Sequence, residues 1–160
     1  MADFIGLLKA NEDCFSNPRF IIGNPWNNEP YGYCCSNGRR AFVSLNNCTW
    51  HDRKLVLQLG PDWGLPTGIS WDIYRWHPEP AKLQDPGTGF TGNVEIALRP
   101  FQVLLLEMVP HGSGPSLGKE FRAEIPRSSF VEPSRDLCPE VMVAKNADGF
   151  PAPIREEEPD

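Results

Sequence analysis

Proline and glycine divide this chain so densely that few stretches could hold a helix of ten or more residues. The sequence has 17 prolines and 14 glycines among its 160 residues. Proline removes a backbone donor and restricts the residue before it, and glycine weakens both helices and strands. Their combined share stays below the roughly 25–30% at which disorder becomes the default, and 40% of the residues are hydrophobic. We therefore expect a folded chain built from short elements.

Segments with a period of two dominate the middle of the sequence. Residues 31–35 and 40–46 are joined through Asn37-Gly38, a pair typical of a tight hairpin turn. Residues 53–59 place Leu55, Leu57 and Leu59 on one face. Further strand-like segments cover 70–77, 93–99 and 101–109. Strands at this spacing indicate a sandwich or a barrel, and we adopt an all-β, antiparallel β-sandwich as the fold class.

The two ends of the chain differ from this middle part. Phe4, Leu7 and Leu8 recur at helical spacing, which predicts one short helix within residues 3–15, ended by Asn17-Pro18. After residue 110 the sequence becomes linker-like and weakly apolar. We expect an N-terminal helical segment over residues 1–18, a β-sandwich over 19–110, and an irregular, partly ordered C-terminal tail over 111–160.

Charge and hydropathy exclude some classes of partner. The formal net charge of -6 lacks the basic footprint of a nucleic-acid-binding protein. The apolar run 103–106 is far shorter than the roughly 20 residues of a membrane span. We expect neither nucleic acid nor a membrane as partner. The N-terminus lacks the basic region of a secretory signal, so localisation stays open, extracellular or periplasmic if a signal lies upstream.

The reactive side chains do not form a recognisable centre. Five cysteines without a C-x-x-C motif argue against a zinc ribbon and a closed disulfide framework, and we expect buried or idle thiols. The three histidines lack metal-ligand spacing, so no metal or cofactor is predicted. Most of the acidic residues in the predicted strands and loops are interpreted as turn caps or surface groups, and we expect Glu107 to face solvent. No catalytic residue is assigned.

Three stretches resemble a known family of enzymes. Residues 3–15 (DFIGLLKANEDCF), 20–26 (FIIGNPW) and 29–33 (EPYGY) resemble the junction between the last barrel helix and the C-terminal β-sandwich of α-galactosidase-like glycoside hydrolases. Residues 38–50 (GRRAFVSLNNCTW) are similar to a hairpin of that sandwich, and residues 98–110 (LRPFQVLLLEMVP) to its closing strand. The resemblance covers residues 3 to 110.

The resemblance implies an accessory domain of a glycosidase. In that family the catalytic carboxylates belong to a (β/α)8 barrel, and these 160 residues do not contain one. Cys48 also stands where the family pattern usually has proline. The partners implied are an oligo- or polysaccharide and a glycosidase catalytic domain.

Tryptophan is the residue type that indicates a ligand. Five tryptophans occur in the chain, and a flat indole matches the apolar face of a sugar ring while nearby amides and carboxylates bind its hydroxyl groups. Three of them fall in predicted loops beside polar residues. The predicted carbohydrate-binding residues are Trp26, Trp50, Trp63, Asn47 and Asp62.

Three functions follow from these observations. The first is a non-catalytic carbohydrate-binding module that uses the loop tryptophans. The second is a structural domain that packs on and stabilises a glycosidase barrel, with Phe4, Leu7 and Leu8 as docking residues. The third, a small stand-alone glycan-active hydrolase, requires two carboxyl groups roughly 5–10 Å apart across a cleft.

Overall fold

The computed structural model describes residues 2–83 and 89–124. Residues 125–160 of the expected tail lie outside the described residues. The elements are α1 (Ala2–Ala10), α2 (Glu12–Phe15), β1 (Pro18–Ile22), β2 (Tyr31–Ser36), β3 (Ala41–Asn46), β4 (Arg53–Gln58), β5 (Trp71–His77), β6 (Ala81–Leu83), β7 (Asn93–Leu98), β8 (Val103–Pro110) and β9 (Arg122–Glu124), with short 3-10 turns η1 (Pro25–Asn27) and η2 (Pro61–Trp63).

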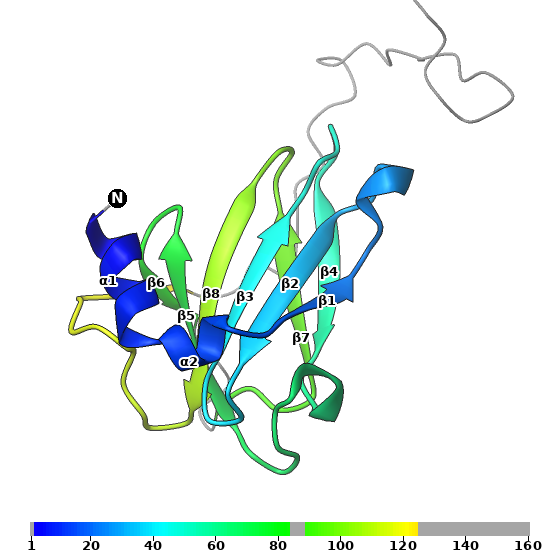
Figure 1. The fold of residues 1–160 in the computed structure, drawn as a ribbon. Helices are drawn as coiled ribbons and strands as arrows, with labels where there is room; N and C mark the ends of the chain where they lie inside the picture. The colour runs from blue at the N-terminus through cyan, green and yellow to red at the C-terminus, as the bar shows by residue number, and fades with distance from the viewer. Residues whose placement is uncertain (1, 84–88, 125–160) are drawn as a thin grey trace, which may run out of the picture. The chain divides into compact units, whose positions relative to one another are not determined.

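The strands form two sheets. The larger has the order β1-β2-β3-β8-β5-β6-β9, and the smaller pairs β4 with β7. Figure 1 shows β4 and β7 behind the larger sheet and the two helices in front of it. All pairs are antiparallel except β6 with β9. The predicted antiparallel sandwich with a short N-terminal helix is confirmed, whereas the parallel pair was not predicted.

The β2–β3 hairpin forms where the sequence predicted it, and its turn explains why. Asn37 Oδ1 accepts hydrogen bonds from the backbone N–H groups of Arg39 and Arg40, and Gly38 has a φ of 83°. Glycine reaches this left-handed region without a Cβ clash. The strands then pair in one register, from Ser36 opposite Ala41 to Tyr31 opposite Asn46.

The main core lies between the two sheets. The larger sheet contributes inward-facing residues of β3, β5 and β8, and the smaller sheet contributes the alternate residues of β4 and β7. The buried members include Val43, Leu45, Ile73, Leu104, Leu106, Leu55, Leu57, Val94, Ile96 and Leu98. This arrangement confirms the one-sided burial predicted for residues 53–59, because Leu55 and Leu57 face the core while Val56 is exposed.

A second core lies on the outer face of the larger sheet. Leu7 of α1 and Cys14 of α2 pack with Phe42 and Trp76, and the ring of Phe15 stacks on Phe42 at 4.6 Å. The helix predicted within residues 3–15 is present, and it is interrupted at Asn11, which divides it into α1 and α2. Because Leu7 is buried here, its side chain is not available as a docking residue.

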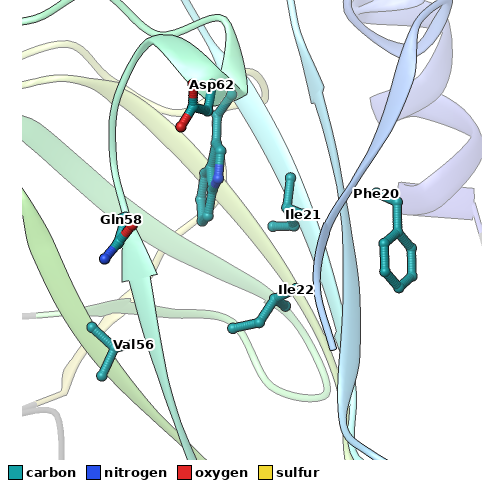
Figure 2. A pocket seen from close by; sticks show the side chains of 7 residues that line it. Phe20, Ile21, Ile22, Val56, Gln58 and Asp62 are labelled. Carbon is teal, nitrogen blue, oxygen red and sulfur yellow. The ribbon is translucent and has the colours of Figure 1, made fainter. Parts of the chain in front are cut away.

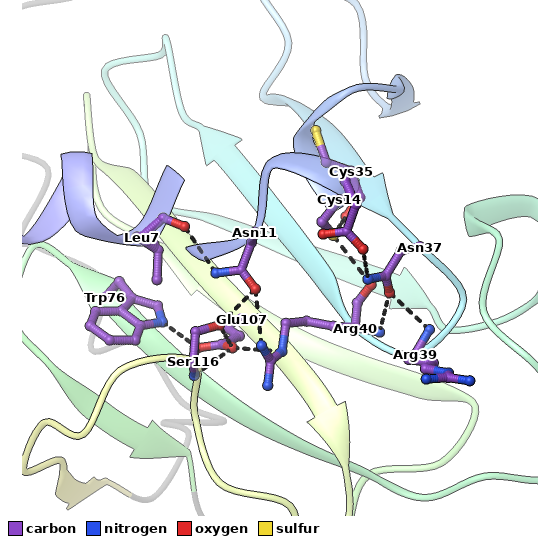
Figure 3. Close-up of polar contacts among 11 residues, drawn as sticks. Leu7, Asn11, Cys14, Cys35, Asn37, Arg39, Arg40, Trp76, Glu107 and Ser116 are labelled. Atoms are coloured by element: carbon purple, nitrogen blue, oxygen red, sulfur yellow. Dashed lines mark hydrogen bonds and ion pairs between the residues drawn. The ribbon is translucent and has the colours of Figure 1, made fainter. Parts of the chain in front are cut away.

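The side chain of Glu107 on β8 links the segments that cover the outer face of the larger sheet to the sheet itself. Its side chain is 0% exposed, so the expectation that it faces solvent is wrong. Trp76 Nε1 donates to Glu107 Oε2 at 2.7 Å, and both the backbone N–H and the hydroxyl of Ser116 donate to the same carboxylate. Figure 3 shows these contacts converging from several elements.

Arg40 completes the network around the buried carboxylate. Its Nε lies 3.0 Å from Glu107 Oε1, but that N–H makes no aligned hydrogen bond, so the contact is an ion pair only. Arg40 Nη1 donates to Asn11 Oδ1 at 2.9 Å, and Asn11 Nδ2 donates to the carbonyl of Leu7 at 2.9 Å. The network therefore joins β8, β5, the β2–β3 turn, the helices and the segment after residue 110.

Replacing Glu107 by glutamine should destabilise the fold strongly. The Glu107→Gln variant leaves Arg40 without its counter-ion and replaces one acceptor oxygen by an NH2 group, which can only donate. Breaking a buried ion pair costs about 3–5 kcal/mol. Urea unfolding measures the loss. The matched control is Glu95→Gln, whose partner Lys54 lies 3.8 Å away on an exposed surface and whose loss costs less than about 1 kcal/mol. Equal effects of the two variants would contradict this account.

Candidate functional site

Three connections meet at one end of the sandwich. They are residues 23–30 between β1 and β2, 47–52 between β3 and β4, and 99–102 between β7 and β8. The register places Tyr31 opposite Asn46 and Asn46 opposite Val103, so these strands begin or end at the same edge. Cys48 Sγ also donates to the carbonyl of Glu29 at 3.1 Å, which joins two of the connections. We call this surface the loop end (Figure 1).

Trp26 projects from the loop end. Its side chain is 91% exposed, although its backbone is fixed in η1. Asn24 caps this turn, because its side-chain oxygen accepts from the backbone N–H of Trp26 at 3.0 Å. The turn closes at Asn28 with a φ of 58°, a conformation that asparagine tolerates better than most residues. The backbone of Trp26 is therefore ordered, while its exposed indole has no packing role among the described residues.

Trp50 and Phe101 form an exposed aromatic pair at the same end. Trp50 is 68% exposed and Phe101 is 51% exposed. Their ring centroids lie 4.6 Å apart with an interplanar angle of 88°. Sequence reasoning missed Phe101 because it was counted in a predicted strand, where an aromatic residue is ordinary. Its position directly after Pro100, between two strands, was the signal that could have placed it in a turn.

Asn47 reaches the loop end but does not face solvent. It is 0% exposed, and its side-chain amide donates to the carbonyl of His51 in its own connection and to that of Arg99 in the 99–102 connection. Of the predicted binding residues, the structure therefore brings Trp26, Trp50 and Asn47 to one end, with the two tryptophans on the surface and the asparagine beneath it.

Asp62 and Trp63 lie at the opposite end of the sandwich, in η2 after β4. Trp63 is 6% exposed and packs in the main core, so its indole offers no open face to a sugar. Both residues line a pocket of about 360 Å³ with Ile21, Ile22, Val56 and Gln58. In Figure 2 the side chains of Ile21 and Ile22 turn toward Val56 and Gln58, while Phe20 turns away. The predicted set does not form one surface.

Asp72 is the second buried carboxylate of the outer face. His111 Nδ1 lies 3.0 Å from Asp72 Oδ1, the backbone N–H of Gly112 donates to Oδ2 at 3.0 Å, and Lys82 Nζ lies 3.2 Å from Oδ2. Burial by itself raises the pKa of Asp72, but the contacts with His111, Gly112 and Lys82 outweigh it and hold the pKa below its ordinary value. The same pairing raises the pKa of Lys82 against its own burial.

These carboxylates do not resemble an acid–base pair. Asp72 and Glu107 share a sheet face, yet each is occupied by its own donors and a paired cation, and neither lines either of the two described pockets. The second pocket, about 570 Å³, includes Glu79 and Glu120 beside Arg75 and Arg122. Arg75 Nε donates to the carbonyl of Glu79 at 2.9 Å. The acidic groups of this second pocket are surface-exposed.

The thiols and histidines of the described chain give little support for other chemistry. Cys14, Cys34, Cys35 and Cys48 are free, and Cys138 lies outside the described residues. Burial raises the pKa of Cys14 to about 11 and that of Cys34 to about 12, which keeps both thiols protonated. Within residues 2–83 and 89–124, no group of three or more potential ligands is placed to hold a metal ion. No described helix combines the length and apolarity required to cross a membrane.

Comparisons with known proteins give a partial likeness. No protein-family model matches the sequence, and no curated protein matches it. Among solved structures, the chain is similar to a Bacillus halodurans protein assigned as an α-N-acetylgalactosaminidase, with 20% identity, a TM-score of 0.43, and coverage of 58% of this chain and 20% of that chain.

A second similar structure is a GH27 β-L-arabinopyranosidase from Geobacillus stearothermophilus. The identity is 17%, the TM-score is 0.43, and the match covers 62% of this chain and 21% of that chain. A variant of this enzyme in complex with arabinose gives 16% identity and a TM-score of 0.41 over 59% and 20% of the two chains. The matched part is about a fifth of each of these glycosidase chains, and the likeness concerns fold alone.

Replacing Asp72 by asparagine should remove a pH-dependent part of the stability. Because the folded state holds the pKa of Asp72 below its ordinary value of 3.8, the carboxylate stabilises the fold above that pH and loses this contribution as the pH falls through 3.8 and below. The Asp72→Asn variant should therefore be less stable than the wild type at neutral pH, with a difference that stays constant down to about pH 5 and shrinks as the pH falls from there toward about pH 2. Urea unfolding across this range measures it, and a difference independent of pH would contradict the assignment.

Proposed function

We propose that this chain is a non-catalytic accessory β-sandwich of a glycoside hydrolase system that binds oligo- or polysaccharide at the loop end. One observation carries the proposal: Trp26 and Trp50 are 91% and 68% exposed at the same end of the sandwich, beside Phe101. The other three tryptophans are buried in the two cores. Trp26 and Trp50 therefore differ from the other tryptophans in having no place in either core.

The physics of sugar binding favours such a surface. A sugar ring presents C–H groups on its faces, and an exposed indole buries a large area against them at little cost in rotamer entropy. Amide side chains near the aromatic rings supply donors and acceptors for hydroxyl groups. At the loop end these include Asn27 and Asn28 beside Trp26, and Asn46, whose Nδ2 donates to the hydroxyl of Tyr31 at 3.0 Å.

The aromatic geometry also guides the choice of ligand. Since Trp50 and Phe101 lie at 88° to each other, their rings form a corner and not a flat strip. A corner accommodates one ring of a soluble chain more readily than the flat surface of a crystalline polysaccharide. Suitable probes are soluble galactomannan, arabinogalactan and xylan. The sequence resemblance to the sandwich domain of α-galactosidase-like enzymes supports the same class of partner.

The absence of catalysis is part of the proposal. It is supported by the engagement of Asp72 and Glu107 in buried contacts, because a general acid must be able to reach its substrate. Release of reducing sugar by the purified chain, abolished by Glu79→Gln or Glu120→Gln, would overturn this part and favour the stand-alone hydrolase.

A second candidate function is docking onto a glycosidase barrel. Phe4 and Ile5 on α1 are each about half exposed, which leaves an apolar surface on the N-terminal helix. If this surface docks, a separately expressed barrel should associate with the chain and lose that association in Phe4→Asp. Sugar binding at the loop end would be unaffected by the same change.

Removing the indole of Trp50 should weaken binding to the soluble polysaccharide probes by at least about tenfold, which corresponds to about 1.4 kcal/mol of lost contact. Affinity electrophoresis with each polysaccharide in the gel measures the change. Trp26→Ala should also weaken binding, and both variants should keep the wild-type unfolding midpoint within a few degrees, because the two side chains are exposed.

The matched control is Phe20→Ala. Phe20 is a half-exposed aromatic on β1, in an edge-to-face contact with Tyr33 at 5.3 Å, and it belongs to none of the three connections of the loop end. This variant should bind as the wild type does. Failure of the wild type to be retarded by any of the three polysaccharides, or unchanged retardation of Trp50→Ala, would count against the proposal.

A further inference from the structure

Asn47 uses every polar group of its side chain to join two connections of the loop end. Its Nδ2 donates to the carbonyls of His51 and Arg99, each at 2.8 Å. Its Oδ1 accepts from the backbone N–H of Thr49 at 3.1 Å and from the Thr49 hydroxyl at 2.8 Å. The backbone N–H of Asn47 donates to the carbonyl of Gln102 at 2.9 Å. No polar group of the Asn47 side chain is left for a ligand.

Phe101 occupies a backbone conformation that its side chain does not favour. Its φ is 54°, in the left-handed region where a bulky residue costs free energy that glycine would avoid. Its side chain is also half exposed, so burial does not offset this cost. The turn is held by the backbone N–H of Gln102, which donates to the Arg99 carbonyl, and by Gln102 Oε1, which accepts from the Arg99 N–H. The conformation aims the ring at Trp50.

The two arms of the aromatic corner therefore rest on one buried amide. Trp50 is flanked by Thr49 and His51, both of which bond to Asn47. Phe101 lies in the turn from Arg99 to Gln102, where the Arg99 carbonyl accepts from Asn47 Nδ2 and the Gln102 carbonyl accepts from the Asn47 backbone N–H. A second contact comes from Thr49, whose hydroxyl oxygen accepts from the backbone N–H of His51 at 3.3 Å.

We infer that Asn47 is the positioning residue of the sugar site: it fixes the angle between Trp50 and Phe101 and contacts no sugar itself. This inference rests on the proposed function. It changes the role predicted for Asn47, since the sequence suggested a direct contact. The gain is preorganisation, because a corner already formed in the free protein loses less conformational entropy on binding than two mobile loops.

The test uses the full chain labelled with 5-fluorotryptophan, which gives one 19F NMR resonance for each of the five tryptophans. Single Trp→Phe variants assign them. In Asn47→Ala the Trp50 resonance should shift and broaden, while those of Trp71 and Trp76 in the cores should stay in place. Retardation by the soluble polysaccharides should fall about as far as in Trp50→Ala, roughly tenfold or more.

Val94→Ala provides a control for lost stability alone. Val94 is buried near the opposite end of the sandwich, opposite Leu57 in the β4–β7 pair. This variant should lower the unfolding midpoint yet keep the Trp50 resonance and the polysaccharide affinity. If Asn47→Ala does not fold, Thr49→Ala removes one arm of the same network and should broaden the Trp50 resonance with a smaller loss of affinity.

The outcomes separate the two claims. An unmoved Trp50 resonance in a folded Asn47→Ala or Thr49→Ala variant overturns the positioning role, and so does an equal loss of affinity in Val94→Ala. If the wild type binds none of the polysaccharides, the proposed function fails and the sugar-site role with it, while a moved Trp50 resonance would still show that Asn47 orders the aromatic corner.

Discussion

The buried carboxylate of Glu107 is the constraint on which this architecture depends. A charged group removed from water costs several kcal/mol unless partners surround it, and a single sheet face cannot supply them. The partners come from Trp76 on β5, Arg40 before β3 and Ser116 beyond β8. Asn11 then connects Arg40 to the helices, because it accepts from Arg40 and donates to the carbonyl of Leu7. The outer layer is thus specified by polar contacts as well as by the apolar packing around Phe42.

Because both faces of the larger sheet are at least partly covered, few surfaces remain exposed for binding. The smaller sheet covers the inner face of the larger one, and the helices with residues 116–121 cover part of its outer face. Asp72 adds a second polar anchor that holds the turn at His111 and Gly112 against β5. The loop end is left with an exposed aromatic cluster, and its backbone is ordered by Asn24 and Asn47 instead of by a hydrophobic core.

The sequence predicted the regular parts of this fold well, because the signals there are local. Asn37-Gly38 marks the hairpin, and the alternating leucines of residues 53–59 mark a half-buried strand. Glu107 was misjudged because alternation indicates only which face a residue takes, and both faces of β8 are covered. Trp63 and Trp50 look alike in sequence, each in a polar loop, yet one fills the core and the other is exposed. Phe101 was missed because residues 101–109 were assigned to one predicted strand, although the strand begins only at Val103.

Hydrogen–deuterium exchange with and without saturating soluble polysaccharide tests the central claim most directly, because it locates the bound surface without any substitution. The account predicts slower exchange in residues 24–28, 47–52 and 99–103, with unchanged exchange in the core strands and around η2. Slower exchange confined to the pocket between β1 and β4, or no change at the loop end with any of the three polysaccharides, would contradict it.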